Sequence, residues 1–363
     1  MKIAVVDLAS NNGGALTITK SFFEYIAAGN APSHEWYYII ANQILNETPF
    51  VNIVRFPDAG NGFIRRSVVK HIRINRFIRK NRIDAAVFMD NMGIAGCPVP
   101  QFVYLHQSLP FQKTKNFSFL KREEREFAIR QHLQGSMIKR SISSSACVFV
   151  QTEWMKKAVL DQVKNVHVVN IGYPQSPAQE GSEGADILSK DFFYPCSPLI
   201  YKNIPVIIKA VNALRELAYS FHFYTTLTEE ELKTLGRTDT IDKGVFVCLG
   251  RIPNERVRQL YKKTTLVFPS YIESLGLPLV EARDTGCWII ASDCAFSHEI
   301  LDSYPNKDYF QPFDEKELMK HMKNVLDGTV SLKKTKSLRR EICWENLVGC
   351  IQERMVNDAN RQN

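Results

Sequence analysis

Short runs of β-branched and aromatic residues alternate with longer amphipathic stretches along most of the chain. This alternation is typical of βαβ units, in which helices join parallel strands and cover both faces of a sheet. The runs predict strands at residues 2–8, 35–41, 51–56, 84–90, 101–107, 146–152, 165–170, 192–196, 219–226, 244–249, 264–269 and 287–292. The stretches predict helices at residues 15–28, 63–81, 118–142, 153–161, 204–218, 314–327 and 338–358. We therefore expect an α/β protein with parallel, doubly wound sheets.

The alternation is interrupted by a segment with the composition of a linker. Residues 172–190 contain eight Gly, Pro or Ser in 19 positions, which cannot contribute a hydrophobic core. We expect a domain on each side of this linker, at residues 1–171 and 191–337. Ligands of open α/β sheets bind at the carboxyl ends of the strands, so a cleft between the two domains is the expected binding site.

The composition excludes several other classes of protein. A chain of 363 residues that is 45% hydrophobic and 23% charged is globular rather than disordered or fibrous, and no apolar run approaches the roughly 18 residues that span a bilayer. Asp7 interrupts the apolar start of the chain, which predicts a first strand rather than a signal peptide and therefore a cytoplasmic protein. The eight cysteines form no C-x-x-C pair and mostly lie in apolar runs. This favours reduced, buried thiols over disulfides or a zinc site.

Positive charge is concentrated in the first half of the chain. Residues 1–171 carry 22 Lys and Arg against 12 Asp and Glu, a net charge of +10. Residues 172–363 carry 24 against 26, a net charge of −2. This asymmetry indicates that the first half faces an anionic partner such as nucleic acid, phospholipid headgroups or a phosphorylated substrate.

Eight of these cations lie within residues 64–82, where a helix is expected and no acidic residue occurs. On a helical projection one broad face carries Arg66, Lys70, Arg73 and Arg76, and the opposite face carries Ile64, Val68 and Ile72. We expect the apolar face to pack on the sheet and the basic face to bind an anionic membrane, where each cation contributes on the order of 1 kcal/mol. The alternative is an ordinary helix whose basic face is solvated.

The second domain contains the clearest candidate site. A polar loop carrying Glu273 follows a predicted strand, and a helix is expected to begin at about Gly276. Backbone N–H groups around Ser274, Leu275 and Gly276, together with the helix dipole, would bind an anion such as a diphosphate. Glu281, on the same helix, can accept hydrogen bonds from sugar or ribose hydroxyls. The alternative is a surface helix with one exposed glutamate in the preceding loop.

The first domain offers two weaker signals. Gly13 and Gly14 follow the first predicted strand and open a helix, which lets the backbone approach an anionic ligand. The segment is not G-x-G-x-x-G, and no suitably placed acid ends the second strand, which counts against an NAD enzyme. His106, in YLHQSLPF, lies at the carboxyl end of a predicted strand, and Asp90-Asn91 end the preceding one, so these residues could border one cavity. A structural role for His106 is the alternative.

The text PS-x-x-E-S-x-G-x-P-x-x-E-A, followed by G-x-x-x-x-A-S-D and by His298-Glu299, closely resembles the signature of glycosyltransferase family 4. These are retaining sugar-nucleotide transferases with two Rossmann-like domains facing across a cleft, the GT-B architecture. Glu273 and Glu281 match the E-x7-E pair of the family, whereas Ser274 and Leu275 replace its usual Gly-Phe. The resemblance covers essentially the whole chain and implies that a final helix at 338–363 crosses back to the first domain.

The resemblance also implies roles for individual residues. His106 would line the donor-sugar pocket, Lys202 in FFYPCSPLIYKN would bind phosphate, and Glu273 would contact the donor sugar. Many relatives have an arginine where this chain has Ser197, so the phosphates would have one cation fewer, and Arg251 is a candidate substitute. The implied donor-binding residues are Gly13, Gly14, Ser197, Arg251, Ile252, Ser274, Leu275, Gly276 and Glu281.

The function that this resemblance implies is transfer of a sugar from a nucleoside-diphosphate sugar to a glycan acceptor on a polyprenyl lipid carrier. Such enzymes build cell-surface polysaccharides such as capsule or O-antigen, here from the inner face of the plasma membrane and with no metal or other cofactor required. One alternative is a GT-B sugar-nucleotide epimerase, which the family signature disfavours. The other is a non-catalytic nucleic-acid-binding protein, which the burial of the aromatic residues in predicted strands disfavours. The sequence leaves the donor sugar, its base and the oligomeric state open.

Overall fold

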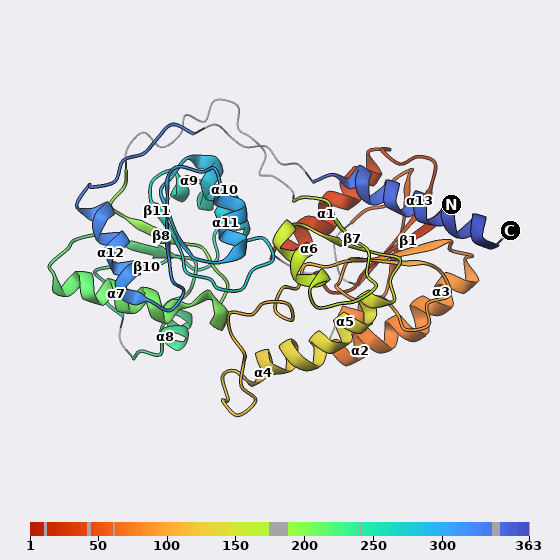
Figure 1. Ribbon diagram of the computed structural model, residues 1–363, viewed down its shortest axis with the longest axis horizontal. Coiled ribbons are helices and arrows are strands. Elements are labelled where there is room, and N and C mark those ends of the chain that lie inside the picture. The colour runs from red at the N-terminus through yellow and green to blue at the C-terminus, as the bar shows by residue number, and fades with distance from the viewer. Residues whose placement is uncertain are drawn as a thin grey trace. The chain divides into compact units, whose positions relative to one another are not determined.

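The computed structural model describes residues 1–10, 13–41, 45–60, 62–173, 188–239, 241–335 and 342–362. The chain divides into two compact units, which Figure 1 shows with their elements labelled. Unit 1 comprises Met1–Pro174 with Arg340–Asn363, and unit 2 comprises Gln175–Arg339. Residues 174–187 of the expected linker lie outside the described residues.

Among the described residues, unit 1 forms a seven-stranded parallel sheet in the order β3-β2-β1-β4-β5-β6-β7. The central strands read as continuous apolar runs because helices cover both faces of the sheet. The order reverses between β1 and β4, which is the topological switch point of a doubly wound sheet. The strands are β1 (Lys2–Asp7), β2 (Glu35–Ile40), β3 (Val51–Arg55), β4 (Ala85–Phe88), β5 (Gln101–Tyr104), β6 (Cys147–Val150) and β7 (Val168–Asn170).

The last helix of the chain completes the core of unit 1. Helix α13 (Trp344–Gln362) packs beside α1 (Gly13–Ala27) on one face of the sheet. The Trp344 ring lies 4.7 Å from that of Phe22 and 6.1 Å from that of Tyr104, measured between centroids. Its indole N–H donates to Ser21 Oγ at 3.1 Å.

Two long helices on the other face of this sheet contain π-helical turns. The first consists of α2 (Phe63–Val68), a π turn η2 (Val69–Ile74) and α3 (Asn75–Lys80). The second consists of α4 (Arg125–Ala128), a π turn η3 (Ile129–Gln134) and α5 (Gly135–Ser143). Helix α6 (Glu153–Leu160) and a short 3₁₀ turn, η1 (Pro57–Gly60), complete the helices described in this unit.

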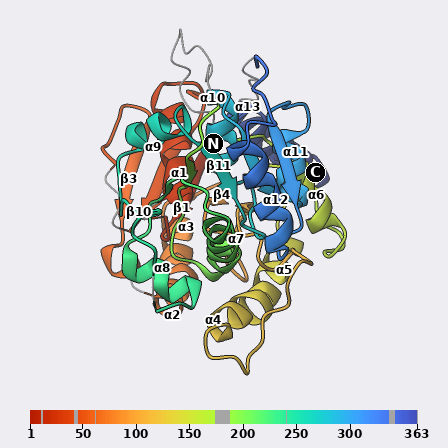
Figure 2. The same cartoon turned by 90° about the vertical axis from the view of Figure 1, so that its left-hand side faces the viewer.

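Within the described residues, unit 2 forms a six-stranded parallel sheet in the order β10-β9-β8-β11-β12-β13. Helices α7 and α12 lie side by side against it (Figure 2). The strands are β8 (Phe192–Tyr194), β9 (Phe223–Thr225), β10 (Phe246–Cys248), β11 (Thr265–Phe268), β12 (Ile289–Ser292) and β13 (Lys307–Phe310). The helices are η4 (Ile200–Lys202), α7 (Ile204–Glu216), α8 (Glu229–Gly236), α9 (Asn254–Tyr261), α10 (Leu277–Thr285), α11 (Ala295–Leu301) and α12 (Glu315–Leu326).

The two parallel sheets confirm the predicted α/β fold of two doubly wound units. The sequence analysis did not predict β13 or the helices α8, α9 and α11. Strand β13 is an edge strand with the sequence KDYF and only one buried residue, so it lacks the apolar run that marks the other strands. Within the described residues, no helix combines the length and the apolarity needed to cross a bilayer.

Candidate functional site

Helix α10 in unit 2 begins where the sequence predicted, with Gly276 as its N-cap and proline in its first turn. Gly276 has φ +80°, which strains any residue with a side chain, and a Cβ there would lie 3.4 Å from Leu279. Within the part of the chain that the structure describes, no side chain caps this end of the helix. The start of α10 therefore offers backbone N–H groups and the positive end of the helix dipole to an anion.

Lys202 and Glu273 form an ion pair beside this helix start. The Lys202 ammonium contacts Glu273 Oε1, which also accepts a hydrogen bond from Ser270 Oγ at 2.7 Å. The two side chains are only 11% and 16% exposed. Burial acts to lower the pKa of Lys202, but the attraction and hydrogen bond of Glu273, together with the interactions of Tyr201 and Cys196, outweigh it and the pKa is raised. Lys202 therefore carries its positive charge across the physiological pH range.

Asn203 holds the two loops of this site together. It sits at φ +59°, a left-handed conformation that asparagine tolerates better than most residues. Its side-chain amide donates to Pro269 O at 3.3 Å and to Pro312 O, at the ends of β11 and β13. Tyr201 O accepts from the Tyr271 N–H at 3.2 Å. The sequence analysis passed over Asn203, although an Asn directly before a helix that has proline in its first turn is a recognisable signal for such a turn.

Glu281 lies on α10, eight residues after Glu273. Tyr261 Oη donates to Glu281 Oε2 at 3.2 Å. Burial raises the pKa of Glu281, and the hydrogen bond from Tyr261 opposes part of that rise. A carboxylate that burial shields from water in this way is stabilised by any hydroxyl that donates a hydrogen bond to it.

The remaining predicted residues of unit 2 lie on the loops at the carboxyl ends of its strands. Ser197 follows β8 and is exposed, Arg251 follows β10 and is exposed, and Ile252 is half-buried. The structure therefore brings Lys202, Glu273 and the start of α10 together. Among the described residues, no hydrogen bond or ion pair joins Ser197 or Arg251 to the Lys202–Glu273 pair.

In unit 1, polar side chains collect at the carboxyl ends of β1, β4 and β5. Asn91, at φ +71°, accepts hydrogen bonds from the backbone N–H groups of His106 (2.8 Å) and Gln107 (2.9 Å). Its Nδ2 also lies 3.2 Å from His106 Nε2. Burial lowers the pKa of His106, with partial opposition from the charge of Asp7. Because His106 is neutral and Asn91 donates to Nε2, the imidazole proton resides on Nδ1.

Asp7, which the sequence analysis did not consider for the site, shapes the loop before Gly13 and Gly14. Its Oδ1 accepts from the backbone N–H groups of Ala9 and Ser10, each at 3.0 Å, and its Oδ2 accepts from Thr19 Oγ1. Gly13 and Gly14 open α1 as predicted. Asn11 and Asn12 of the same loop lie outside the described residues.

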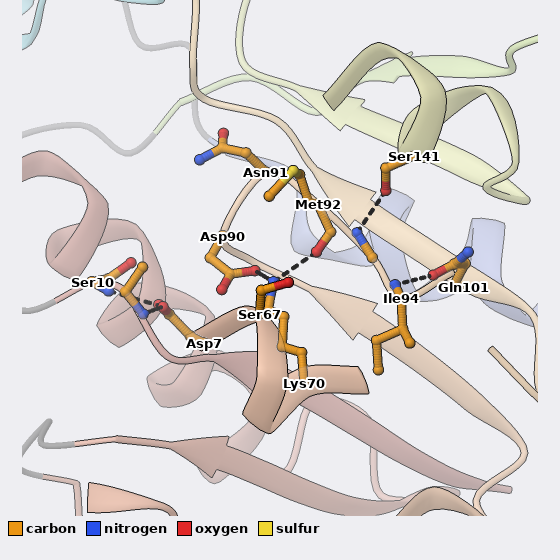
Figure 3. Close-up of polar contacts among 12 residues, drawn as sticks. Asp7, Ser10, Ser67, Lys70, Asp90, Asn91, Met92, Ile94, Gln101 and Ser141 are labelled. Atoms are coloured by element: carbon orange, nitrogen blue, oxygen red, sulfur yellow. Dashed lines mark hydrogen bonds and ion pairs between the residues drawn. The ribbon is translucent and has the colours of Figure 1, made fainter. Parts of the chain in front are cut away.

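A cavity of about 740 Å³ lies in unit 1 beside the loop that follows β4. Figure 3 shows how this loop is fixed: the Gly93 N–H donates to Ser141 Oγ and the Ile94 N–H to Gln101 Oε1, each at 2.9 Å. A Cβ at position 93 would lie 2.0 Å from Gln101 Oε1, so a larger residue there would displace the Gln101 side chain from its hydrogen bond with the Ile94 N–H. The long helices that contain η2 and η3 both contribute residues to the lining of the cavity.

A buried ion pair between Lys70 and Asp90 closes one side of this cavity (Figure 3). The two side chains are 5% and 1% exposed, and Lys70 Nζ also donates to Met92 O at 2.8 Å. Burial raises the pKa of Asp90, and the charge of Lys70 opposes this. Among the described residues, Asp90 Oδ2 and Arg66 Nε are buried without a hydrogen-bond partner. Both residues line the cavity, so it offers a carboxylate and a guanidinium to a polar ligand.

The sequence was wrong about which face of this helix is exposed. Val69, Ile74 and Ile78 face the core, whereas the residues expected there are exposed: Ile64 by 79%, Val68 by 51% and Ile72 by 63%. Val69 and Ile74 are five residues apart, the step of a π turn, and a projection at 3.6 residues per turn does not align them.

Lys70 was also wrongly predicted to face a membrane, because it is buried against Asp90. Arg66 is half-buried and lines the cavity. Arg73 is exposed but neutralised by Asp58 at 2.6 Å, and Arg76 is exposed as predicted. The cations of this helix therefore divide between the cavity and the surface.

Comparison with known proteins assigns unit 2. Residues 190–341 match the family model described as glycosyl transferases group 1. Unit 2 is similar to a glycosyltransferase group 1 domain. The match supports a glycosyltransferase and covers the segments that carry Lys202, Glu273 and Glu281. A comparison of the sequence with curated proteins finds no match.

Several solved structures are similar to this chain over at least 90% of its length. Sucrose-phosphate synthase from Thermosynechococcus elongatus is similar with a TM-score of 0.63 at 14% identity, covering 90% of each chain. WaaG, a glycosyltransferase involved in lipopolysaccharide biosynthesis, has a TM-score of 0.61 at 13% identity, again over 90% of each chain. The lipopolysaccharide outer core galactosyltransferase WaaB has a TM-score of 0.56 at 16% identity over 92% of each chain. At these identities the likeness shows the fold, the GT-B class of two parallel-sheet α/β domains.

Proposed function

We propose that the protein is a retaining glycosyltransferase that binds a nucleoside-diphosphate sugar on unit 2 and a glycan acceptor on unit 1. The observation that carries this proposal is the ion pair of Lys202 with Glu273 beside the start of α10, inside a unit similar to a glycosyltransferase group 1 domain. A cation and a row of backbone N–H groups suit a diphosphate. The resemblance to glycosyltransferase family 4 supports the retaining outcome.

In the proposed reaction the bond between the anomeric carbon and the diphosphate breaks as an acceptor hydroxyl forms its bond on the same face of the sugar. Positive charge develops on the sugar ring, and negative charge grows on the departing diphosphate. Lys202 and the N–H groups at the start of α10 stabilise that growing charge effectively, because they are already oriented and need no rearrangement. In this proposal no divalent ion is required. The departing phosphate oxygen accepts the proton of the acceptor hydroxyl.

Glu273 has two roles in this proposal. Its carboxylate holds the Lys202 ammonium in place and accepts hydrogen bonds from hydroxyls of the donor sugar. Glu281, further along α10, accepts from the ribose hydroxyls of the nucleotide. His106, which the family resemblance assigns to the donor sugar, is kept neutral by burial.

We assign the cavity beside Asp90 to the acceptor. Its lining offers Asp90 and Arg66 together with the hydroxyl of Ser141 and the amide of Gln134, a set that suits a hydroxyl-rich glycan. The basic character of unit 1 fits an acceptor carried on a polyprenyl phosphate in cell-surface polysaccharide synthesis. Such an acceptor would be found at the inner face of the plasma membrane.

A panel of UDP-, GDP-, ADP- and dTDP-sugars tests the donor assignment. A ligand that binds only the native state raises the melting temperature, so one base should produce a clear shift. Incubation of that donor with lipid-linked acceptors should then give a glycoside with the anomeric configuration of the donor. A product of inverted configuration would refute the retaining mechanism, and conversion of the donor without an acceptor would indicate an epimerase.

Replacing Glu281 with glutamine should weaken donor binding more than it slows the chemical step. The ribose contact exists in both the ground state and the transition state, so its loss raises KM and leaves kcat nearly unchanged. A several-fold rise in the donor KM is the expected result of steady-state kinetics. Glu216→Gln, a change at an exposed position at the end of helix α7 in the same unit, is the matched control. A large fall in kcat with an unchanged KM would contradict the ribose assignment.

The proposed membrane contact moves to a surface that the sequence did not predict. One exposed apolar stripe lies on each of the two long helices that line the cavity, and we name the two stripes together the paired-helix surface. Its members are Ile64, Val68 and Ile72 on the first helix and Ile129, Leu133 and Met137 on the second. Each stripe has the four-residue spacing of one helix face, and exposed apolar residues flanked by cations are typical of surfaces that lie on a bilayer.

Exposed cations flank the first stripe. Arg65, Arg76 and Arg79 are exposed on the same helix, and each cation near an anionic bilayer contributes about 1 kcal/mol. Changing all three to glutamine should weaken binding to anionic vesicles by roughly 100-fold while leaving donor affinity unchanged. Sedimentation with vesicles at several salt concentrations measures this, because salt screens the attraction.

Two further variants complete the vesicle experiment. Ile64→Ser with Val68→Ser and Ile72→Ser should also reduce binding, because it removes the apolar stripe and keeps the charge. The control changes three exposed cations of unit 2, Lys262, Lys263 and Lys316, to glutamine and should bind like the wild type. Equal binding by all variants, or binding of the wild type to zwitterionic vesicles alone, would show that the helices are ordinary solvated surfaces.

A further inference from the structure

Three potential metal ligands from distant parts of the sequence meet on unit 1. Cys147 is the first residue of β6, His167 immediately precedes β7, and Cys350 lies on α13. The Sγ atoms of the two cysteines and an imidazole nitrogen of His167 lie within 4.8 Å of one another. The group is separate from the loops at the carboxyl ends of the strands, because Cys147 and His167 lie at the opposite, amino ends of β6 and β7.

Regular structure fixes the position of each member of this group. The Val148 N–H donates to His167 O at 2.8 Å, so pairing between neighbouring strands places His167 beside Cys147. On α13, Leu347 and Ile351 are fully buried in the core that also contains Cys147, and Cys350 packs against that core.

We propose that Cys147, His167 and Cys350 bind one Zn²⁺ ion. Thiolate sulfur and imidazole nitrogen are the ligands that zinc prefers, and two Cys with one His and a water form a known tetrahedral set. Zn–S bonds of about 2.3 Å and Zn–N bonds of about 2.0 Å require the ligand atoms to lie roughly 3.3–3.8 Å apart. The observed spacing reaches that range with shifts of about 1 Å, which side-chain torsions supply.

The two thiolates of the group match the charge of such an ion, and further charged side chains lie nearby. Glu353 and Arg354 follow one turn after Cys350 on α13, and both interact electrostatically with His167 and Cys350. Two thiolates cancel the charge of Zn²⁺, whereas Glu353, Arg354 and Lys156, which also interacts electrostatically with His167, together leave one net positive charge nearby. The fourth coordination position is left to water on the exposed side, where His167 lies.

The bound ion would tie the last helix of the chain to the strands β6 and β7. The sequence analysis favoured plain buried thiols because the ligands have no motif spacing: 20 residues separate Cys147 from His167, and 183 separate His167 from Cys350. The proposal concerns the stability of unit 1, and it stands or falls independently of the proposed sugar transfer.

Zinc titration of the purified full-length chain under reducing conditions tests the site. The protein is first freed of metal with a chelator, and bound zinc is then counted by mass spectrometry after equilibrium dialysis. We expect one Zn²⁺ per chain, a higher melting temperature with zinc than without it, and thiolate-to-metal absorption bands when Co²⁺ replaces Zn²⁺. His167→Gln and Cys350→Ser should weaken zinc binding by more than 100-fold, beyond the roughly 10–100-fold effect of changes outside the ligand shell.

His167→Gln is the decisive variant because His167 is exposed and its replacement leaves the core intact. Cys343→Ser, a half-buried cysteine just before α13, is the matched control and should bind zinc like the wild type. Wild-type zinc binding by His167→Gln, or no zinc uptake by the folded wild type, would overturn the proposal. Formation of a Cys147–Cys350 disulfide on air oxidation, in a protein that takes up no zinc when reduced, would also overturn it and leave a redox pair instead.

Discussion

Lys202→Ala should lower kcat by about 10²–10³-fold at saturating donor concentration, the range expected when a preoriented group opposite a developing charge is removed. The charge on the departing diphosphate grows during the reaction, so the loss falls on the transition state more than on the bound donor. Steady-state kinetics at several donor concentrations separates kcat from KM. The fall in kcat should therefore exceed the rise in KM.

Lys209→Ala is the matched control for this experiment. Lys209 lies on α7 in the same unit, and its ion pair with Glu315 is largely exposed. Its replacement removes one positive charge from unit 2 without touching the site, so kcat should stay within experimental error. An unchanged kcat for Lys202→Ala would refute the role assigned to Lys202.

Lys70→Ala should destabilise unit 1 by about 3–5 kcal/mol, because it leaves the carboxyl of Asp90 buried without its cation. Burial already raises the pKa of Asp90 and Lys70 opposes that rise, so the substitution raises the pKa further. The lost attraction exists only while Asp90 is ionised. The deficit should therefore be largest near pH 7 and shrink as the pH falls and Asp90 becomes protonated, which denaturant unfolding at several pH values measures.

Two further variants define this result. Lys70→Met combined with Asp90→Leu should cost less than Lys70→Ala alone, because no unpaired charge remains in the core. Arg73→Ala removes a cation three residues along the same helix from an exposed pair with Asp58 and should cost less than about 1 kcal/mol. Equal destabilisation by Lys70→Ala and Arg73→Ala would show that the buried pair contributes no more to stability than the exposed pair.

The sequence predicted the fold well because a buried parallel strand can be recognised from its own short segment of sequence. The runs that become β1, β4 and β6 are apolar on both faces and are bounded by polar residues, so their positions follow from composition alone. The edge strand β13 has no such signal because only Phe310 in it is buried. Its place in the sheet comes from pairing with β12, which a single segment does not reveal.

The candidate site could be predicted only where short motifs carry it. Glu273, Glu281 and the start of α10 lie within one stretch of sequence, so spacing was enough to place them on one loop and helix. The ion pair of Glu273 with Lys202 joins residues 71 positions apart, and only the meeting of the loops after β8 and β11 creates it.

The same limit explains what was wrong about the basic helix. Lys70 pairs with Asp90, which lies 20 positions further along the chain at the end of a strand. A helical pattern alone does not distinguish a lysine that is buried in such a pair from one that is exposed. The helix also has apolar residues on two faces, so periodicity alone does not show which of them meets the sheet.

The packing of α13 against α1 has a consequence for the order in which the chain acquires structure during synthesis. The ribosome releases the strands of unit 1 first, but Phe22 and Tyr104 keep an uncovered apolar surface until Trp344 arrives. Unit 2, whose residues are contiguous, has all its strands and helices before that moment. The unit that is synthesised first therefore completes its hydrophobic core last. A nascent chain arrested before residue 344 would expose this surface to chaperones and proteases.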